Sequence, residues 1–345
     1  MSFFSDIIIK WYSKHKRNLP WRNTKNPYEI WISEIILQQT KVDQGLPYYT
    51  KFIKKFPNFS ILANANEEEV LKLWQGLGYY SRARNLHMAA KQIDKAGLFP
   101  AKYEDIILLK GVGEYTAAAI ASFAFKKPYA VVDGNVFRLL SRFYGIKTPI
   151  NSKKGKKQFS DLAQNLLNKE NPDIHNQAIM EFGSQICKPK KSNCTKCPLN
   201  DKCIAFKESS IYDLPVKNNK VKLKTLYFEY FFFKMNGYTL VNKRTEKGIW
   251  QNMYEFPLIN CEKLMKNESI LNHDQFKLWV DKINFNLESI SVFKHVLSHR
   301  KINARFWEIN CLNKLPKSNF KKIKINEIDK IAVPRLIEKF IEVKI

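Results

Sequence analysis

Residues 109–117 read LKGVGEYTA, a short stretch with two glycines between segments of helical period at 104–109 and 114–125. Gly111 and Gly113 let the backbone approach a phosphate group closely, and the N-terminus of the helix that follows offers free N–H groups. Taken alone, G-x-G is also typical of an ordinary turn between two helices. The rest of the chain therefore decides whether this turn binds a ligand or only connects two helices.

The chain around this turn, residues 1–210, is predicted to be an all-α domain. Asn26 is a good N-cap, Pro27 stands at the first helical position, and Glu29 lies three residues after the cap. A helix is therefore expected from here to Thr40. Further segments with helical period lie at 67–75, 81–95, 135–143, 157–168 and 174–186.

Beyond residue 210 the pattern changes, and a second domain is predicted. A polar stretch with a proline indicates a linker at 211–224. Residues 226–233 are dense in aromatic side chains, which favours a strand, and Asn236-Gly237 is a hairpin turn signal. With a second strand-rich stretch at 291–309, residues 225–345 are expected to form a smaller α+β domain.

Composition limits the class of protein. The chain has 345 residues, a formal net charge of +26 and 45% apolar residues, which is too apolar for a disordered chain and long enough for two domains. The excess positive charge predicts a polyanionic partner, nucleic acid first and an anionic membrane second. No secretory signal and no run of about 20 apolar residues is visible. A soluble cytosolic protein is expected, in which clustered cysteines bind metal rather than form disulfides.

Four cysteines follow the pattern C-x6-C-x2-C-x5-C: Cys187, Cys194, Cys197 and Cys203. This spacing suits a 4Fe–4S cluster with one thiolate at each iron corner. A zinc ribbon stays the alternative, although it usually has two C-x2-C pairs set well apart, and only one is present. Lysines surround these cysteines, so residues 187–203 are expected to be a phosphate-binding loop. Cys261 and Cys311 are isolated and are expected to be small buried hydrophobes.

Two acidic residues, Glu34 and Asp133, lie in contrasting surroundings. Glu34 shares a helical face with Ile30 and Leu37, and a carboxyl group on an apolar face has a raised pKa. Asp133 stands just before the helical segment 135–143, where backbone N–H groups and the helix dipole favour the ionised form. Glycosidic bond cleavage uses such a pair, because one acid protonates the leaving group and the other supports the cation left on the sugar.

Together, the glycine turn, Asp133 twenty residues after it and the four-cysteine loop resemble the signature of the endonuclease III superfamily of helix-hairpin-helix DNA glycosylases. Within that superfamily the chain resembles the adenine DNA glycosylases, which remove adenine mispaired with 8-oxoguanine. The matching strings are LPWR at 19–22, WISEIILQQT at 31–40, GLGYYSRARNL at 76–86 and VDGN at 132–135. The resemblance covers nearly all of the first domain. The second domain resembles the Nudix-like domain of that family more loosely.

The resemblance implies roles for individual residues. The implied catalytic residues are Glu34, Asp133, Tyr115 and Asn135. The implied substrate- and DNA-binding residues are Arg22, Gln39, Thr40, Leu77, Tyr79, Gly111, Gly113, Glu181, Ser298 and His299. Glu34 would protonate adenine N7, and Asp133 would stabilise the oxocarbenium ion or bond to it transiently. Arg22 and Glu181 would line the adenine pocket.

The residue at position 115 implies a subclass within the glycosylase superfamily. Lyase members of the superfamily carry lysine at the position of Tyr115, and a lysine forms a Schiff base with the sugar that leads to strand cleavage. Tyrosine cannot form this bond. The resemblance therefore implies a monofunctional glycosylase.

The second domain is expected to recognise 8-oxoguanine rather than to hydrolyse nucleotides. A working Nudix enzyme needs several acidic residues on one helix to hold Mg²⁺, and no such helix follows the stretch 248–257. The family's Phe-Ser-His loop corresponds to Leu297-Ser298-His299 here. Leu297 replaces the aromatic residue, and the other two keep their polar contacts.

Three alternatives are open. The same fold could act on thymine or uracil, the chain could be a DNA-binding iron–sulfur protein without catalysis, or it could be a nucleotide pyrophosphohydrolase. The presence of both Glu34 and Asp133 disfavours the second, and the missing acidic helix disfavours the third. The expected partner is double-stranded DNA with A:8-oxoguanine or A:G mispairs, bound by a monomer at the nucleoid in the cytoplasm and not at a membrane.

Overall fold

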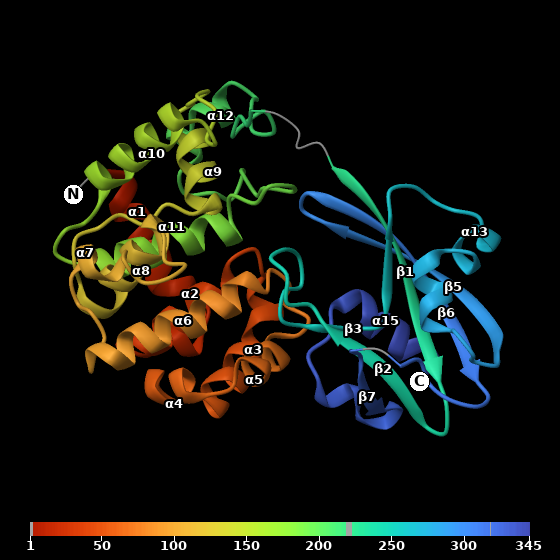
Figure 1. Ribbon diagram of the computed structural model, residues 1–345. Helices are drawn as coiled ribbons and strands as arrows, with labels where there is room; N and C mark the ends of the chain where they lie inside the picture. Colours follow the sequence, from red (N-terminus) through yellow and green to blue (C-terminus); the bar gives the residue numbers. More distant parts are fainter. Residues whose placement is uncertain (1–2, 219–222, 318) are drawn as a thin grey trace. The chain divides into compact units, whose positions relative to one another are not determined.

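The structure of the protein, a computed structural model, describes residues 3–218, 223–317 and 319–345. The chain forms two compact units, each built from two separate stretches of sequence (Figure 1). The first unit comprises Met1–Asn64 and Asn85–Asn219, and the second comprises Ala65–Arg84 and Lys220–Ile345. Within the expected linker at 211–224, residues 219–222 lie outside the described residues.

The first unit has only helices as regular secondary structure in its described part, which confirms the predicted all-α character. Its helices are α1 (Phe3–His15), α2 (Pro27–Leu37), α3 (Val42–Lys55), α4 (Phe59–Asn64), α7 (Tyr103–Ile106), α8 (Glu114–Phe125), α9 (Gly134–Phe143), α10 (Lys153–Leu166), α11 (Pro172–Gln185) and α12 (Ile204–Lys207), with 3-10 turns at Pro20–Arg22 and Asn200–Lys202. Helix α5 (Glu67–Trp74) belongs to the second unit. Helix α6 (Ser81–Ala96) begins in the second unit and ends in the first.

Helix α2 shows how local sequence sets an element. The Asn26 side chain accepts a hydrogen bond from the Tyr28 N–H at 3.0 Å, so the predicted cap is confirmed. The helix ends at Leu37 rather than at the predicted Thr40. Gln39 has a φ of +58°, a left-handed conformation that cannot continue a right-handed helix.

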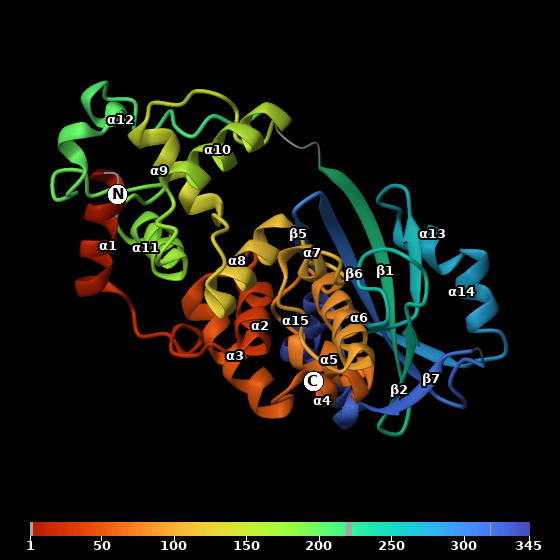
Figure 2. The same ribbon diagram turned by 90° about the vertical axis from the view of Figure 1, so that its left-hand side faces the viewer.

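The core of the first unit lies among α1, α9, α10 and α11, and α1 runs beside α11 (Figure 2). Its buried side chains include Phe4, Ile8, Tyr12, Val136, Leu140, Phe159, Ile179 and Phe182. Helix α2 packs against α8, whose run of small residues at 117–119 and 121 allows close approach. This packing fixes α2, α8, the start of α9 and α11 as the frame of the site described below.

The second unit is built on two sheets. The four-stranded sheet has the order β4 (Leu258–Cys261), β1 (Lys224–Lys234), β6 (Arg300–Cys311) and β5 (Phe285–Leu297). The three-stranded sheet has the order β3 (Tyr254–Glu255), β2 (Tyr238–Lys243) and β7 (Lys321–Lys324). β1 and β6 pair in parallel, and β5 and β6 form an antiparallel hairpin. The remaining elements are α13 (Asn267–Leu271), α14 (Asp274–Trp279), a 3-10 turn at Ile325–Lys330 and α15 (Arg335–Lys344).

Strand β1 is buried on both faces, which explains its run of aromatic residues. Phe231 lies 5.0 Å from Phe276 of α14 by ring centroids, while its neighbour Phe232 lies 5.5 Å from Phe340 of α15. Alternate side chains of a strand point to opposite faces, so each face of the sheet has its own helical cover. The hairpin predicted at Asn236-Gly237 is present, with φ values of +50° and +76° at these two residues.

In the described part of the chain, no helix combines the length and apolar character that crossing a membrane requires.

Candidate active site

Glu34 and Tyr115 come from two packed helices and meet in the interior of the first unit. The Tyr115 hydroxyl donates a hydrogen bond to Oε2 of Glu34 at 2.7 Å. Glu34 is only 5% exposed. Burial raises the pKa of Glu34 to about 7, although the hydrogen bond from Tyr115 works in the opposite direction. The expected raised pKa is thus found, and an exposed position for this glutamate is excluded.

Asp133 is the N-cap of α9, as its place in the sequence predicts. Its Oδ1 accepts hydrogen bonds from the backbone N–H groups of Asn135 and Val136 at 2.9 and 2.8 Å. Its Oδ2 accepts a further hydrogen bond from Nδ2 of Asn135 at 2.6 Å. These contacts favour the ionised form, as expected, but burial acts more strongly in the opposite direction. Burial raises the pKa of Asp133, and the hydrogen bonds reduce this effect without reversing it.

One cavity of about 160 Å³ joins these groups. It is lined by Arg17, Leu19, Trp21, Arg22, Ile30, Ser33, Glu34, Leu37, Thr40, Val42, Tyr115, Phe123, Asp133, Asn135, Gln177, Met180, Glu181 and Ser184. All four expected catalytic residues and the expected adenine-pocket residues Arg22 and Glu181 are among them. The volume suits a single flat heterocycle rather than a whole nucleotide.

Glu181 lines this cavity together with its two arginine partners. It is 1% exposed and accepts hydrogen bonds from Nη2 of Arg17 and from Nη2 of Arg22, each at 2.6 Å. Burial by itself raises the pKa of Glu181, but the hydrogen bonds from the two arginines outweigh it and bring the pKa to about 2. This carboxylate is therefore ionised at neutral pH.

Sequence reasoning missed several residues of this cavity, among them Arg17, Gln177 and Met180. Arg17 pairs with Glu181, and Gln177 accepts a hydrogen bond from the Tyr12 hydroxyl at 2.8 Å through Oε1. Gln177 and Met180 lie four residues and one residue before Glu181 on α11. The spacing from Glu181 could have indicated Gln177, because residues four apart share one face of a helix.

The cavity opens into a groove of about 1120 Å³ on the first unit. Gln39, Thr40 and Asp133 line this groove, together with Lys188 and Lys190 from the cysteine loop. Cationic side chains along a groove that leads to a cavity can hold a polyanion while one of its groups enters.

The glycine turn has the geometry that its sequence predicts. Gly111 has a φ of +77°, and a Cβ at this position would lie 2.6 Å from Cβ of Asn85. No other residue fits there without displacing the turn. Gly113 is the N-cap of α8, so the free N–H groups of that helix lie beside the turn.

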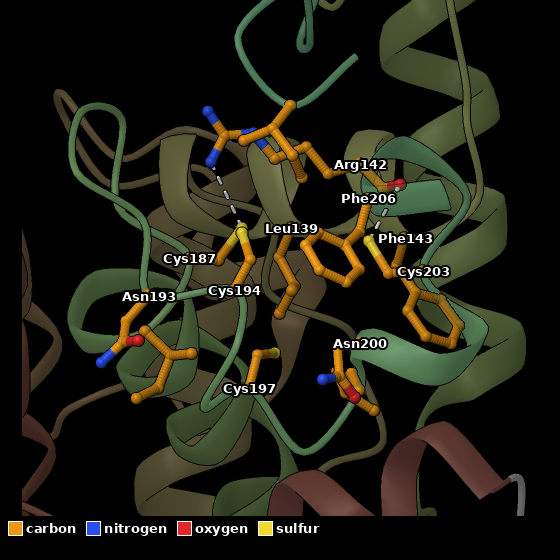
Figure 3. A pocket seen from close by; sticks show the side chains of 13 residues that line it. Leu139, Arg142, Phe143, Cys187, Asn193, Cys194, Cys197, Asn200, Cys203 and Phe206 are labelled. Carbon is orange, nitrogen blue, oxygen red and sulfur yellow. Dashed lines mark hydrogen bonds between the residues drawn. The ribbon is translucent and has the colours of Figure 1, made fainter. Parts of the chain in front are cut away.

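The four clustered cysteines line one small cavity of about 30 Å³ (Figure 3). Its other lining residues include Leu139, Phe143 and Ile186, and the Arg142 guanidinium lies at one end, with Nη1 3.5 Å from Sγ of Cys187. Burial raises the pKa of the Cys197 thiol to about 11. Among the described residues, no group of three or more His, Cys, Asp or Glu side chains comes together as a site for one metal ion. The donor set, four thiols in an apolar setting, fits a group that binds thiolates.

Helix α9 connects the cysteine loop to Asp133. Arg138 donates from Nη2 to Oδ1 of Asn135 at 2.9 Å and from Nε to the Cys187 carbonyl at 2.6 Å. Asn135 in turn donates to Asp133. A displacement of Cys187 would therefore shift the Asp133 carboxylate through the side chains of Arg138 and Asn135.

The remaining expected base-reading residues lie in the second unit, around a cavity of about 520 Å³. Leu77, Tyr79, Ser298 and His299 all line it, and the hydroxyl groups of Tyr79 and Ser298 are hydrogen-bonded to each other. Ser298 and His299 form the exposed turn between β5 and β6, whereas Leu77 is buried. Leu297 lines the same cavity. Of the two isolated cysteines in this unit, Cys311 is buried as expected, whereas Cys261 is only partly buried.

Two protein-family models match the chain. The helix-hairpin-helix GPD superfamily of base excision DNA repair proteins matches residues 32–165, and the NUDIX domain matches residues 230–343. These matches confirm the predicted combination of an all-α glycosylase region with a Nudix-like α+β region.

Named relatives agree with this assignment. The chain is 36% identical over 349 residues to the adenine DNA glycosylase of Buchnera aphidicola subsp. Acyrthosiphon pisum, covering 98% of this chain and 97% of that protein. It is 41% identical over 213 residues to the human adenine DNA glycosylase, covering 59% of this chain and 39% of that protein.

Solved structures match the helical part. A thermostable thymine-DNA glycosylase superposes with a TM-score of 0.55 at 31% identity, covering 59% of this chain and 95% of the other. A non-covalent endonuclease III–DNA complex gives a TM-score of 0.53 at 21% identity, covering 60% and 95%, and at that identity it shows the fold alone. The chain therefore belongs to the adenine DNA glycosylases, N-glycosylases of base excision repair with an endonuclease III-like helical fold and a Nudix-like C-terminal domain.

Proposed function

We propose that this protein excises adenine paired with 8-oxoguanine or guanine in duplex DNA, as a monomer, and leaves the strand intact. The observation that carries the proposal is the presence of Glu34, Asp133 and Glu181 in one cavity of about 160 Å³. A cavity of this size takes a base only when that base has left the duplex stack, so base flipping is part of the proposal.

Glu34 is the general acid. With a pKa of about 7 it is protonated in a large share of molecules at neutral pH, and it gives its proton to N7 of the flipped adenine. The C1′–N9 bond then breaks, and its electron pair leaves with the adenine. Water adds to C1′ of the sugar cation, and the proton that this water loses returns to the Glu34 carboxylate.

Asp133 stabilises the sugar cation as a carboxylate. Its three hydrogen-bond donors, two backbone N–H groups and the Asn135 amide, favour the anion and fix its orientation. Tyr115 holds the Glu34 carboxyl in place and supplies no amine. The 160 Å³ cavity is lined by described residues that include no lysine, which supports release of the base without lyase chemistry.

Glu181 and Arg22 select adenine within the cavity. The ionised Glu181 accepts a hydrogen bond from the adenine amino group, and Arg22 donates toward a ring nitrogen. Guanine presents a carbonyl oxygen at the same place, which an ionised carboxylate repels. Gln177 has its Oε1 engaged by Tyr12, so its amide N–H groups are the part that can face a base.

The four cysteines are proposed to hold a 4Fe–4S cluster. Bound by one thiolate at each iron, the cluster would cross-link residues 187–203 and give the loop a fixed shape. Lys188 and Lys190, which line the groove, would then meet the DNA backbone in a defined position.

The second unit is proposed to read the base opposite adenine. Tyr79, Ser298 and His299 carry the polar groups of its cavity, and Leu77 and Leu297 add apolar surface. Gln39 and Thr40 of the first unit are proposed to contact the same 8-oxoguanine once DNA is bound. In this proposal residues 1–210 are the glycosylase domain, 211–224 the linker and 225–345 the recognition domain.

The test is single-turnover base release from matched duplexes. Adenine opposite 8-oxoguanine and opposite guanine, thymine opposite guanine, and uracil opposite guanine are compared, with and without alkali. Adenine release from the 8-oxoguanine duplex, with strand breaks only after alkali, is expected. Faster release of thymine or uracil, or breaks without alkali that borohydride traps, would refute the proposed specificity or the proposed monofunctional chemistry.

A further inference from the structure

The 520 Å³ cavity of the second unit has a cationic wall that base reading does not use. Three arginines line it, Arg84, Arg300 and Arg335, together with the imidazole of His295. Of the residues that line the cavity, all within the described part of the chain, none is an aspartate or glutamate. A neutral oxidised base needs no such surplus of positive charge.

The three arginines differ in how their charge is compensated. Nη1 of Arg335 lies 2.8 Å from a carboxylate oxygen of Glu338 and 2.5 Å from one of Glu342, so this charge is neutralised. Nη1 of Arg84 donates to the carbonyl oxygen of Gln251 at 3.0 Å, a contact without a counter-charge. Within the described residues, neither Arg84 nor Arg300 forms an ion pair. Glu67 acts electrostatically on Arg84 without forming an ion pair with it, so Arg300 is the more fully available of the two to an anion from outside the chain.

A strained loop forms the aromatic side of the cavity. Trp250 and Asn252 have φ values of +60° and +65°, which side chains other than glycine rarely adopt. The loop is fixed by the backbone N–H groups of Arg244 and Asn252, which donate to Met253 and Arg244 at 2.9 and 2.6 Å, and by the bond from Arg84. Trp250 is thereby held as one wall of the cavity, almost fully buried. Strain that is stabilised in this way at a cavity is typical of a binding site.

The size of the cavity exceeds what a base alone requires. Small-molecule sites have volumes of about 300–1,000 Å³, and a mononucleotide falls within this range. The walls offer an aromatic surface at the exposed Tyr79, hydroxyl groups at Tyr79 and Ser298, and cations at Arg84 and Arg300. These are the groups that a base, its polar edge and a phosphate would each need.

We propose that this cavity binds a whole 8-oxopurine nucleotide, with Arg84 and Arg300 holding the phosphate; this inference rests on the reader role proposed above. The phosphate has two possible sources with the same chemistry, the DNA strand next to the 8-oxoguanine and a free deoxynucleoside monophosphate. Arg300 stands directly after the Ser298-His299 turn and pairs in register with Lys224 of β1, whose N–H donates to the His299 carbonyl at 3.1 Å. Arg300 and the Ser298-His299 turn thus lie next to each other at one end of the β5–β6 hairpin.

The experiment uses the full-length protein and two binding measurements. The first is calorimetric titration with 8-oxo-dGMP, with 8-oxodeoxyguanosine and with dGMP. The second is the affinity for duplexes with 8-oxoguanine or guanine opposite a non-cleavable adenine analogue. Each is repeated with Arg300→Gln, with Arg300→Lys, which keeps the charge, and with Lys322→Gln, an exposed control on β7 that does not line the cavity.

Loss of the phosphate contact is expected to weaken binding about tenfold or more, the effect of one charge-assisted hydrogen-bond pair. Arg300→Gln should lower the affinity for 8-oxo-dGMP to that of the nucleoside, or lower the affinity for the 8-oxoguanine duplex more than for the guanine duplex. A loss of 8-oxo-dGMP affinity alone assigns the site to free nucleotides. A selective loss of affinity for the 8-oxoguanine duplex alone assigns it to the DNA strand. Arg300→Lys should restore part of the loss, and Lys322→Gln should change neither.

Equal behaviour of Arg300→Gln and the unmodified protein in both measurements overturns the phosphate site. That result is distinct from failure of the reader role, which would appear in the unmodified protein as equal affinity for the 8-oxoguanine and guanine duplexes.

Discussion

Replacement of Glu34 by glutamine removes the acidic proton and keeps the shape of the site. Glutamine has nearly the same size, and its side-chain oxygen can still accept the hydrogen bond that Tyr115 donates to Glu34 at 2.7 Å. The proton for adenine N7 is lost. A positioned general acid contributes about a hundredfold to ten-thousandfold, so single-turnover adenine release should fall by about a hundredfold or more while duplex affinity is retained.

The pH dependence follows from the direction of the pKa shift. Only protonated Glu34 can act as the acid, and with a pKa of about 7 the protonated share falls to about a tenth at pH 8. The rate of adenine release should therefore drop about tenfold per pH unit above pH 7 in the unmodified protein. Glu34→Gln should lack this alkaline limb.

The same shift also makes the stability of the fold depend on pH. The pKa of Glu34 is raised from 4.5 to about 7 on folding, so the folded state binds more protons than the unfolded state between these pH values. Stability should then fall as pH rises through this window, by about 3 kcal/mol in total, because one pKa unit corresponds to about 1.4 kcal/mol. Glutamine carries no such charge, so the variant should be more stable than the unmodified protein at pH 8.

Single-turnover kinetics and chemical denaturation at pH 5 and pH 8 check both effects. Glu29→Gln, on the first turn of the same helix and not among the residues that line the cavity, is the matched control. Release within about threefold of the unmodified rate would remove Glu34 from the chemistry. If the unfolding free energy changes between pH 5 and pH 8 by the same amount in the unmodified protein and in Glu34→Gln, then Glu34 is not buried as described.

Three further substitutions test the neighbouring contacts. Tyr115→Phe removes a hydrogen bond that lowers the pKa of Glu34, so the alkaline limb of the pH–rate profile should move to higher pH; a shift to lower pH would contradict the assigned bond. Cys194→Ser should reduce the iron content of the purified protein and its affinity for any duplex together, as iron analysis and a filter-binding assay would reveal; full iron content would exclude this cysteine as a ligand. Arg138→Met removes the contacts to Asn135 and to the Cys187 carbonyl, and it should slow adenine release more than it weakens DNA binding; equal losses in both would indicate a general loss of folding.

Local patterns predicted those features of the site that local structure determines. The cap at Asn26, the turn at Gly111 and the apolar face around Glu34 each depend on residues within one or two helical turns. Each of them is present in the structure, and the four cysteines line one cavity as their spacing indicates.

Features that depend on tertiary burial were not predictable in this way. Asp133 has the N-cap hydrogen bonds that its position implies, but the side chains packed around it raise its pKa, and no local pattern records that burial. Likewise the segment 67–75 is helical as predicted, yet nothing in its periodicity indicates that it packs in the second unit. There Glu68 accepts hydrogen bonds from Lys243 and from the Tyr254 hydroxyl at 2.7 and 2.9 Å.

Three carboxyl groups in one small cavity would repel one another if all were ionised, and the structure assigns their compensation unequally. Glu181 receives two arginines, Arg17 and Arg22, which lower its pKa to about 2 and leave it a permanent anion. Asp133 receives neutral N–H donors, which favour its carboxylate form without a counter-charge. Glu34 receives a single phenol and is left with a pKa of about 7. In the proposed mechanism, Glu181 thus supplies a charge for recognising the base, Asp133 a carboxylate for the sugar cation and Glu34 a transferable proton for the leaving group. Under this mechanism, exchanging the supports of Glu34 and Glu181 would ionise Glu34 and leave no acid for the leaving group.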